Sequence, residues 1–67
     1  MPRVTANGRA VELADGAAVT DLLAVLGVRS RFLVVERNGE PLAREAYATT
    51  ILAAGDQLEI VSPVGGG

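Results

Sequence analysis

The chain ends in Val64-Gly65-Gly66-Gly67, and the α-carboxylate of Gly67 is the group whose setting most suggests chemistry. A terminal carboxylate has a pKa of about 3.5, so it is ionised at neutral pH and can attack an electrophilic phosphorus atom. Glycine has no Cβ, so such a tail is thin and its backbone angles are unrestricted. The pattern predicts a tail that threads into a narrow channel of another protein. The alternatives are a frayed terminus or a leftover linker.

The side chains, by contrast, offer little chemistry. Histidine and cysteine are absent from the 67 residues, which removes disulfides, thiol catalysis and cysteine-based metal sites. The acidic residues do not fall at the spacing of a calcium-binding loop. One domain of this size also has no room for a deep catalytic cleft. We therefore expect no catalytic residue, no metal and no cofactor bound by this chain, and hence no enzyme.

Charge and hydropathy restrict the partners. The net charge is −2, and the six basic residues are all arginines scattered among eight acidic ones. This distribution argues against nucleic acid as a partner. No apolar run approaches membrane-spanning length and no signal region precedes the domain, so we expect no membrane association. Because small secreted domains usually carry disulfides, the lack of cysteine predicts a cytoplasmic protein.

The first half of the chain predicts a hairpin followed by a helix. Asn7-Gly8 separates short apolar stretches at 4–6 and 10–13, and both turn residues accept positive φ. Thr20 is expected to be the helix N-cap, and Gly27 is expected to end the helix in the left-handed conformation. The helix is about two turns long, too short to be stable alone, so its leucine face must pack on a sheet.

The second half predicts three strands. Residues 32–37 are nearly continuously apolar at their start, as in a strand buried on both sides, and Asn38-Gly39 turns the chain. Pro41 restricts the next stretch to a short or edge strand. Residues 44–50 are ambiguous and are interpreted as a short helical turn that packs Tyr47. The last strand covers 57–61, with Leu58 and Ile60 facing one side, and should stop near Ser62 because Pro63 cannot donate to a ladder.

These elements predict an α+β fold: a mixed sheet of four or five strands with one helix packed across one face. The last strand is expected in the middle of the sheet. The core must be mainly aliphatic, with Phe32 and Tyr47, the only aromatic residues, in core or half-core positions. The domain is expected to cover residues 1–61, and residues 62–67 form the tail.

The chain resembles the ubiquitin-like β-grasp sulfur carriers, and among them the carrier of thiazole formation in thiamine biosynthesis. The resemblance covers the whole chain and is carried by the Asn38-Gly39-Glu40 turn, by Ala54-Gly55-Asp56 before the last strand, and by the terminal glycines. Ser62-Pro63 departs from the thiazole carriers, because a proline there is more similar to the small subunit of molybdopterin synthase. That subunit is usually longer than this chain.

The resemblance implies a function and a set of partners. An adenylyltransferase of the ubiquitin-activating type would adenylate the Gly67 carboxylate with ATP and Mg²⁺ that it binds itself. A persulfide donor would convert the adenylate to a thiocarboxylate, and thiazole synthase would receive the sulfur. The chain would then be a protein co-substrate, with Val64, Gly65 and Gly66 threading into the partner.

Docking requires a surface on the body as well. In the resembled family, the sheet face near the last strand meets the activating enzyme, which makes Val61 and Leu58 candidates. Leu58 is better explained as core, and Val61, on the opposite face, is the better contact. The open alternatives are a sister carrier for molybdopterin or another acceptor, a modifier conjugated to target amines, and a β-grasp interaction module whose tail is unused.

Overall fold

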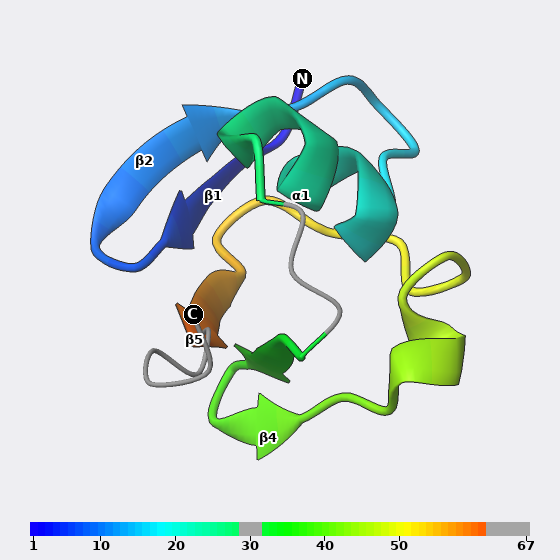
Figure 1. Cartoon of the computed structure of the whole chain (residues 1–67). Coiled ribbons are helices and arrows are strands. Elements are labelled where there is room, and N and C mark those ends of the chain that lie inside the picture. The colour runs from blue at the N-terminus through cyan, green and yellow to red at the C-terminus, as the bar shows by residue number, and fades with distance from the viewer. Residues whose placement is uncertain (29–31, 62–67) are drawn as a thin grey trace.

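The protein folds into one sheet with one helix across it, as a computed structural model shows (Figure 1). The structure describes residues 1–28 and 32–61. Within this part the elements are β1 (Arg3–Ala6), β2 (Arg9–Glu12), α1 (Val19–Leu26), β3 (Val34–Arg37), β4 (Glu40–Pro41), a 3₁₀ turn at Arg44–Ala46, and β5 (Gln57–Val61). The predicted α+β fold with a mixed sheet and one helix is confirmed.

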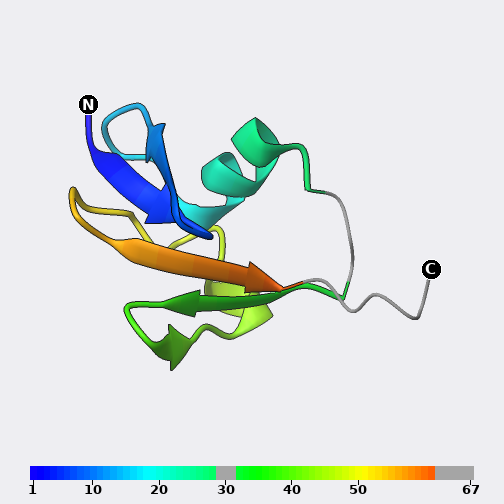
Figure 2. The same ribbon diagram turned by 90° about the vertical axis from the view of Figure 1, so that its left-hand side faces the viewer.

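The five strands lie in the order β2-β1-β5-β3-β4, so the last strand of the chain is central, as expected. It runs parallel to β1 and antiparallel to β3. Figure 2 shows α1 on one side of this sheet, with the other side uncovered. Each strand of the sheet therefore has a face toward the helix and an open face.

Two Asn-Gly pairs close the two hairpins as predicted. Asn7 and Gly8 have φ of 51° and 82°, and Asn38 and Gly39 have φ of 53° and 85°. Positive φ at both central residues produces a turn whose twist matches that of the flanking strands. The second hairpin leads into β4, which is only two residues long and contains Pro41, in agreement with the expectation of a short edge strand.

The predicted N-cap of the helix is wrong. The cap is Ala18, and Thr20 lies inside the first turn of α1. No capping hydroxyl is needed, because the amide of Val19 donates to the Thr50 carbonyl at 3.1 Å and the amide of Thr20 donates to the Tyr47 carbonyl at 3.2 Å. A neighbouring turn thus satisfies the free amides that a side chain would otherwise cap.

The other end of the helix follows the prediction. Gly27 adopts φ of 72° at the C-cap, and the amide of Val28 donates to the Leu23 carbonyl at 3.0 Å. This geometry satisfies carbonyls that the last helical turn leaves without a partner.

The core between α1 and the sheet is aliphatic. Its most enclosed side chains are Val4, Val19, Leu22, Val35 and Leu58. Tyr47 is also buried, as expected, and its hydroxyl donates to the Leu33 carbonyl at 3.5 Å.

The start of β3 differs from the prediction. The strand begins at Val34, not at residue 32, and Phe32 is 66% exposed, so its assignment to the core or half-core is wrong. Val34 pairs with Val61, the last residue of β5, so Phe32 lies beyond the paired register. Burial on both sides of the strand is wrong as well, because Val34 is 48% exposed on the uncovered face of the sheet.

Leu22 should be the side chain whose truncation costs most in this helix. It is fully buried, and Leu22→Ala should lower the free energy of unfolding by about 2–5 kcal/mol. Val25 on the same helix is 63% exposed, so Val25→Ala should change it by no more than about 0.5 kcal/mol. Urea unfolding followed by circular dichroism measures both values, and equal losses would contradict this packing.

Candidate functional site

The predicted tail, residues 62–67, lies outside the described residues, and with it Val64, Gly65, Gly66 and Gly67. What the structure does describe is the element that carries the tail. Strand β5 runs through the middle of the sheet and ends at Val61, directly before residue 62. The candidate site is therefore built from the end of β5 and the surface around it.

The side chains of β5 alternate between core and surface. Leu58 is 1% exposed and Val61 is 57% exposed. Leu58 therefore belongs to the core and cannot serve as a docking side chain in this conformation. Val61 faces the uncovered side of the sheet, and its cross-strand neighbour Val34 is exposed beside it. These two valines form an apolar pair at the end of β5.

An acidic pair adjoins the two valines. Glu36 of β3 is paired with Glu59 of β5 in the antiparallel register, two residues from the Val34–Val61 pair along each strand. Side chains two residues apart in a strand lie on the same face, so all four belong to the open face of the sheet. Like charges directly opposite one another are unfavourable for the isolated sheet. We call Val34, Glu36, Glu59 and Val61 the open-face patch.

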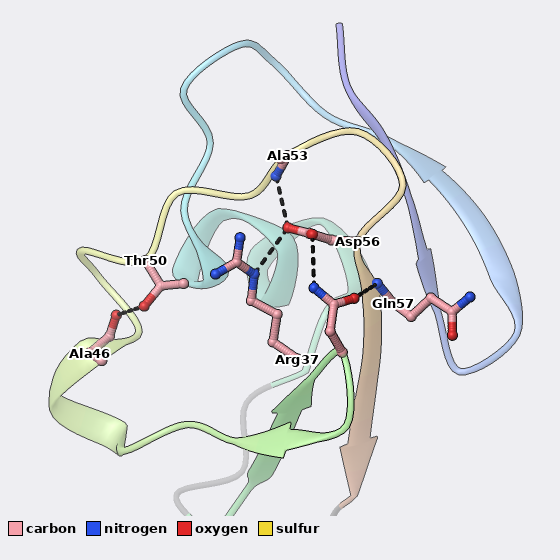
Figure 3. A network of polar contacts seen from close by, with 7 residues as sticks. Arg37, Ala46, Thr50, Ala53, Asp56 and Gln57 are labelled. Carbon is pink, nitrogen blue, oxygen red and sulfur yellow. Dashed lines mark hydrogen bonds and ion pairs between the residues drawn. The ribbon is translucent and has the colours of Figure 1, made fainter.

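The beginning of β5 is fixed by a polar network around Asp56 (Figure 3). The Asp56 carboxylate accepts from the Ala53 amide at 2.8 Å, from Arg37 Nε at 3.0 Å and from Asn38 Nδ2 at 3.1 Å. Asn38 Oδ1 in turn accepts from the Gln57 amide at 2.9 Å. The network ties the turn before β5 to the end of β3.

This network perturbs the acidity of Asp56, which is the one buried charged residue among those described. Burial alone would raise the pKa of its carboxyl group. The hydrogen bonds from Ala53, Asn38 and Arg37, together with the charge of Arg37, outweigh burial and leave the pKa below its usual value of 3.8. The folded state therefore favours the ionised carboxylate.

The sequence did not identify this network. Gly55-Asp56 indicated a turn, and the residues joined through Asp56 are up to 19 positions apart. The local signal is an aspartate directly after the small-residue turn Ala54-Gly55, a pattern too common to single out.

The described residues contain no helix long and apolar enough to cross a membrane. Residues 1–28 and 32–61 also contain no group of three or more histidine, cysteine, aspartate or glutamate side chains able to hold a metal ion.

Known proteins resemble this chain in both sequence and structure. A family model described as the ThiS family matches residues 3–67. The crystal structure of the thiamine biosynthesis protein ThiS from Geobacter metallireducens superimposes with a TM-score of 0.80 at 38% identity, covering 97% of this chain and 99% of that one. The solution structure of the Geobacter protein gives a TM-score of 0.78.

Curated proteins give two kinds of match. The sulfur carrier protein ThiS of Bacillus subtilis (strain 168) is 39% identical over 62 residues, which is 91% of this chain and 94% of the relative. A thiazole synthase of Paramagnetospirillum magneticum is 40% identical over 65 residues, and one of Magnetococcus marinus is 32% identical. The chain spans 20% of the length of each of these thiazole synthases.

The five-stranded mixed sheet, the single crossing helix and the structural matches define a β-grasp protein. Within that class, the chain belongs to the ThiS family.

The Asp56 network makes the stability of the protein depend on pH in a defined direction. The pKa of Asp56 is lowered on folding, so its contribution is complete above the unfolded value of 3.8 and is lost as the pH falls through the folded pKa. Asp56→Asn should cost about 1–3 kcal/mol of unfolding free energy at neutral pH, and the difference from the unaltered chain should shrink below about pH 4.

Urea unfolding of both proteins between acid and neutral pH measures this difference. Glu45→Gln, at an exposed acid, is the control and should change stability by no more than about 0.5 kcal/mol. A difference between Asp56→Asn and the unaltered chain that stays constant, or grows, in acid would contradict the assignment.

Proposed function

We propose that this chain carries sulfur as a thiocarboxylate on Gly67 and donates it for thiazole formation in thiamine biosynthesis. The observation that carries the proposal is the match to the sulfur carrier ThiS of Bacillus subtilis, which spans 91% of this chain and 94% of that protein. A chain matched over nearly its whole length to a carrier is itself a carrier, a protein co-substrate and not a catalyst.

The chemistry begins with a carboxylate that is a poor acyl donor, because an oxide is a poor leaving group. An oxygen of the Gly67 carboxylate attacks the α-phosphorus of ATP, and pyrophosphate leaves. A persulfide sulfur then attacks the acyl carbon of the adenylate and AMP leaves. A thiol reduces the resulting S–S bond, which leaves the sulfur on Gly67 as a thiocarboxylate. A side chain on the last residue would hinder attack at the acyl carbon, which explains a terminal glycine.

The ATP and Mg²⁺ of this reaction belong to an adenylyltransferase of the ubiquitin-activating type. Residues 62–67 of an extended tail reach about 20 Å, enough to place a carboxylate in a buried nucleotide site while the body stays outside. Ordering glycines is costly in conformational entropy, so this partner must hold Val64, Gly65 and Gly66 through backbone hydrogen bonds. We place these steps in the cytoplasm, in keeping with the absence of cysteine.

Thiazole synthase is the acceptor we propose for the sulfur. Two proteins named thiazole synthase contain a segment that is 32–40% identical to this chain over 65 residues. A carrier-like segment joined covalently to a synthase would act at high effective concentration. Its presence there supports the same pairing between separate chains.

The body docks, we propose, through the open-face patch. The exposed valines Val34 and Val61, at the end of the patch next to the tail, would be buried against an apolar surface of the activating enzyme. The facing carboxylates of Glu36 and Glu59 would gain opposite charges from basic residues of that partner, which relieves their mutual repulsion. Val61 is also adjacent to the tail, so docking at the patch brings the tail to the same partner.

A sister carrier role in molybdopterin synthesis is the second candidate, favoured by Ser62-Pro63 at the start of the tail. It shares the activation chemistry and differs in the acceptor. A modifier would instead form amide bonds with lysines of target proteins, and an interaction module would not need Gly66 and Gly67 at all.

Activation can be followed by intact mass spectrometry. Incubation with the cognate adenylyltransferase, ATP, Mg²⁺ and a persulfide donor should give the acyl adenylate and then replacement of one oxygen by sulfur at Gly67. A variant with an alanine added after Gly67 should show neither product, because its new terminus carries a Cβ. Full conversion of that variant, or no adenylate on the unaltered chain, would refute the carrier mechanism. Sulfur transfer to a molybdopterin precursor in place of the thiazole substrate would support the sister role.

The open-face patch can be tested with two matched valines. Val61→Asp should raise the KM for this carrier in adenylation by about tenfold or more, because a charge replaces apolar contact area in the proposed interface. Val25→Asp adds the same charge at a similarly exposed valine of α1 and should leave KM within about twofold. Initial-rate kinetics of pyrophosphate release measures both, with circular dichroism to show that both variants fold. Equal effects at the two sites would exclude the patch.

A further inference from the structure

Strand β1 accompanies β5 for only part of its length. Thr5 and Ala6 are paired with Gln57 and Leu58, and the amide of Asn7 donates to the Leu58 carbonyl at 2.9 Å. The chain then turns away from β5 at Gly8 to form the first hairpin. Within the part of the chain that the structure describes, no strand therefore lies beside the backbone groups of Ile60 on this side.

The side chain of Asn7 takes the place of the missing strand. Asn7 Oδ1 accepts from the Ile60 amide at 2.7 Å, and Asn7 Nδ2 donates to the Ile60 carbonyl at 3.0 Å. A carboxamide offers the same donor and acceptor as a peptide group, so it extends the ladder by one step. Asn7 is in the αL conformation, with φ of 51°, and its side chain reaches two residues further along β5 than its own backbone amide, which binds Leu58.

This contact lies immediately before the tail. On the opposite side of β5, Ile60 and Val61 are paired with Val35 and Val34 of β3. The end of β5 thus has β3 on one side, and on the other side the side-chain amide of Asn7 binds both the N–H and the C=O of Ile60. The end of β5 is the point from which residues 62–67 start.

We propose that Asn7 is a positioning residue that fixes the end of β5 and so delivers the Gly67 carboxylate to the activating enzyme in a productive direction. Its effect on activation rests on the proposed carrier function, whereas its hold on Ile60 does not. When the body is docked, a fixed strand end limits the directions open to the tail. Loosening it leaves docking intact and lowers the fraction of docked complexes in which the carboxylate reaches the nucleotide.

Asn38 provides a matched control within the chain. It occupies the same position of an Asn-Gly turn, with φ of 53°, and its side chain also binds β5. It binds the other end, however, where Oδ1 accepts from the Gln57 amide at 2.9 Å and Nδ2 donates to Asp56 at 3.1 Å. Glycine tolerates positive φ, so Asn7→Gly and Asn38→Gly keep both turns and each removes one side-chain contact with β5.

Amide hydrogen exchange tests the hold on the strand. In Asn7→Gly the amide of Ile60 should exchange about tenfold faster or more, relative to the amide of Leu22 in α1, while that of Gln57 is unchanged. In Asn38→Gly the amide of Gln57 should be the one that accelerates. Ile60 exchange that stays at the level of the unaltered chain in Asn7→Gly, or rises equally in both variants, would overturn the proposal.

Adenylation kinetics tests the positioning. Asn7→Gly should lower kcat about 3–10-fold with KM within about twofold, because docking is preserved and delivery of the tail is not. A merely structural loss would reduce the folded fraction, which raises the apparent KM and leaves kcat unchanged. Asn38→Gly should show only that second behaviour. An unchanged kcat in Asn7→Gly, despite faster exchange at Ile60, would overturn the positioning role.

Asn7→Asp provides a second variant that keeps the turn and the acceptor for the Ile60 amide. It replaces the donor with an anionic oxygen facing the Ile60 carbonyl, so kcat should again fall while the Ile60 amide stays more protected than in Asn7→Gly. Failure of the unaltered chain to become adenylated would refute the carrier function, and hydrogen exchange would still decide whether Asn7 holds the strand.

Discussion

The sheet, and the position of the residue from which the tail starts, depend on the hydrogen bonds of β5, a five-residue strand in the middle of the sheet. A central strand must satisfy its backbone groups on two sides, and the neighbours in this small chain are too short to do so alone. β3 pairs with β5 over four residues and β1 over two, and side chains from the two Asn-Gly turns bind backbone groups of β5 at its start and near its end. Asn38 completes the start of β5 and Asn7 completes its end. The residues that shape the hairpins thus also hold the strand that precedes the tail.

The helix also depends on hydrogen bonds from a segment distant in the sequence. α1 has eight residues, too few for a stable helix in isolation, and its first amides are bound by carbonyls of the turn at 47–50. Leu22 and Val19 then pack in one core with Val35 and Leu58, and Tyr47 is the one aromatic residue in that buried cluster. A small aliphatic core leaves one side of the sheet uncovered, and the open-face patch lies there.

Local signals in the sequence predicted most of the fold, because several elements are determined by their own residues. Asn7-Gly8 and Asn38-Gly39 between short strands, and Gly27 after a helix, favour positive φ, and the structure has it at each. Pro41 likewise restricts β4 to a short edge strand, because proline has no backbone N–H to donate to a neighbouring strand.

The errors came where a distant segment decides the outcome. The predicted cap Thr20 is wrong because the carbonyls of a turn some thirty residues later bind the first amides of the helix. The predicted burial of Phe32 is wrong because β5 ends at Val61, so no residue of β5 pairs opposite Phe32. The roles of Asp56 and Asn7 were missed for this reason too, since the Asn7–Ile60 contact joins residues 53 positions apart. Alternation along the last strand was enough to separate the exposed Val61 from the buried Leu58. The residues beside Val61 and Glu59 on the open face, Val34 and Glu36, could be known only from the strand register.

The strict alternation of β5 has an evolutionary consequence. Gln57, Glu59 and Val61 are exposed, whereas Leu58 and Ile60 are buried. Core packing therefore restricts the residue types at 58 and 60, and does not restrict those at 57, 59 and 61. Substitutions at the odd-numbered positions change the open face of the sheet and leave the buried side chains of β5 in place. A duplicated copy could therefore diverge in specificity through a handful of surface changes while its interior is inherited intact.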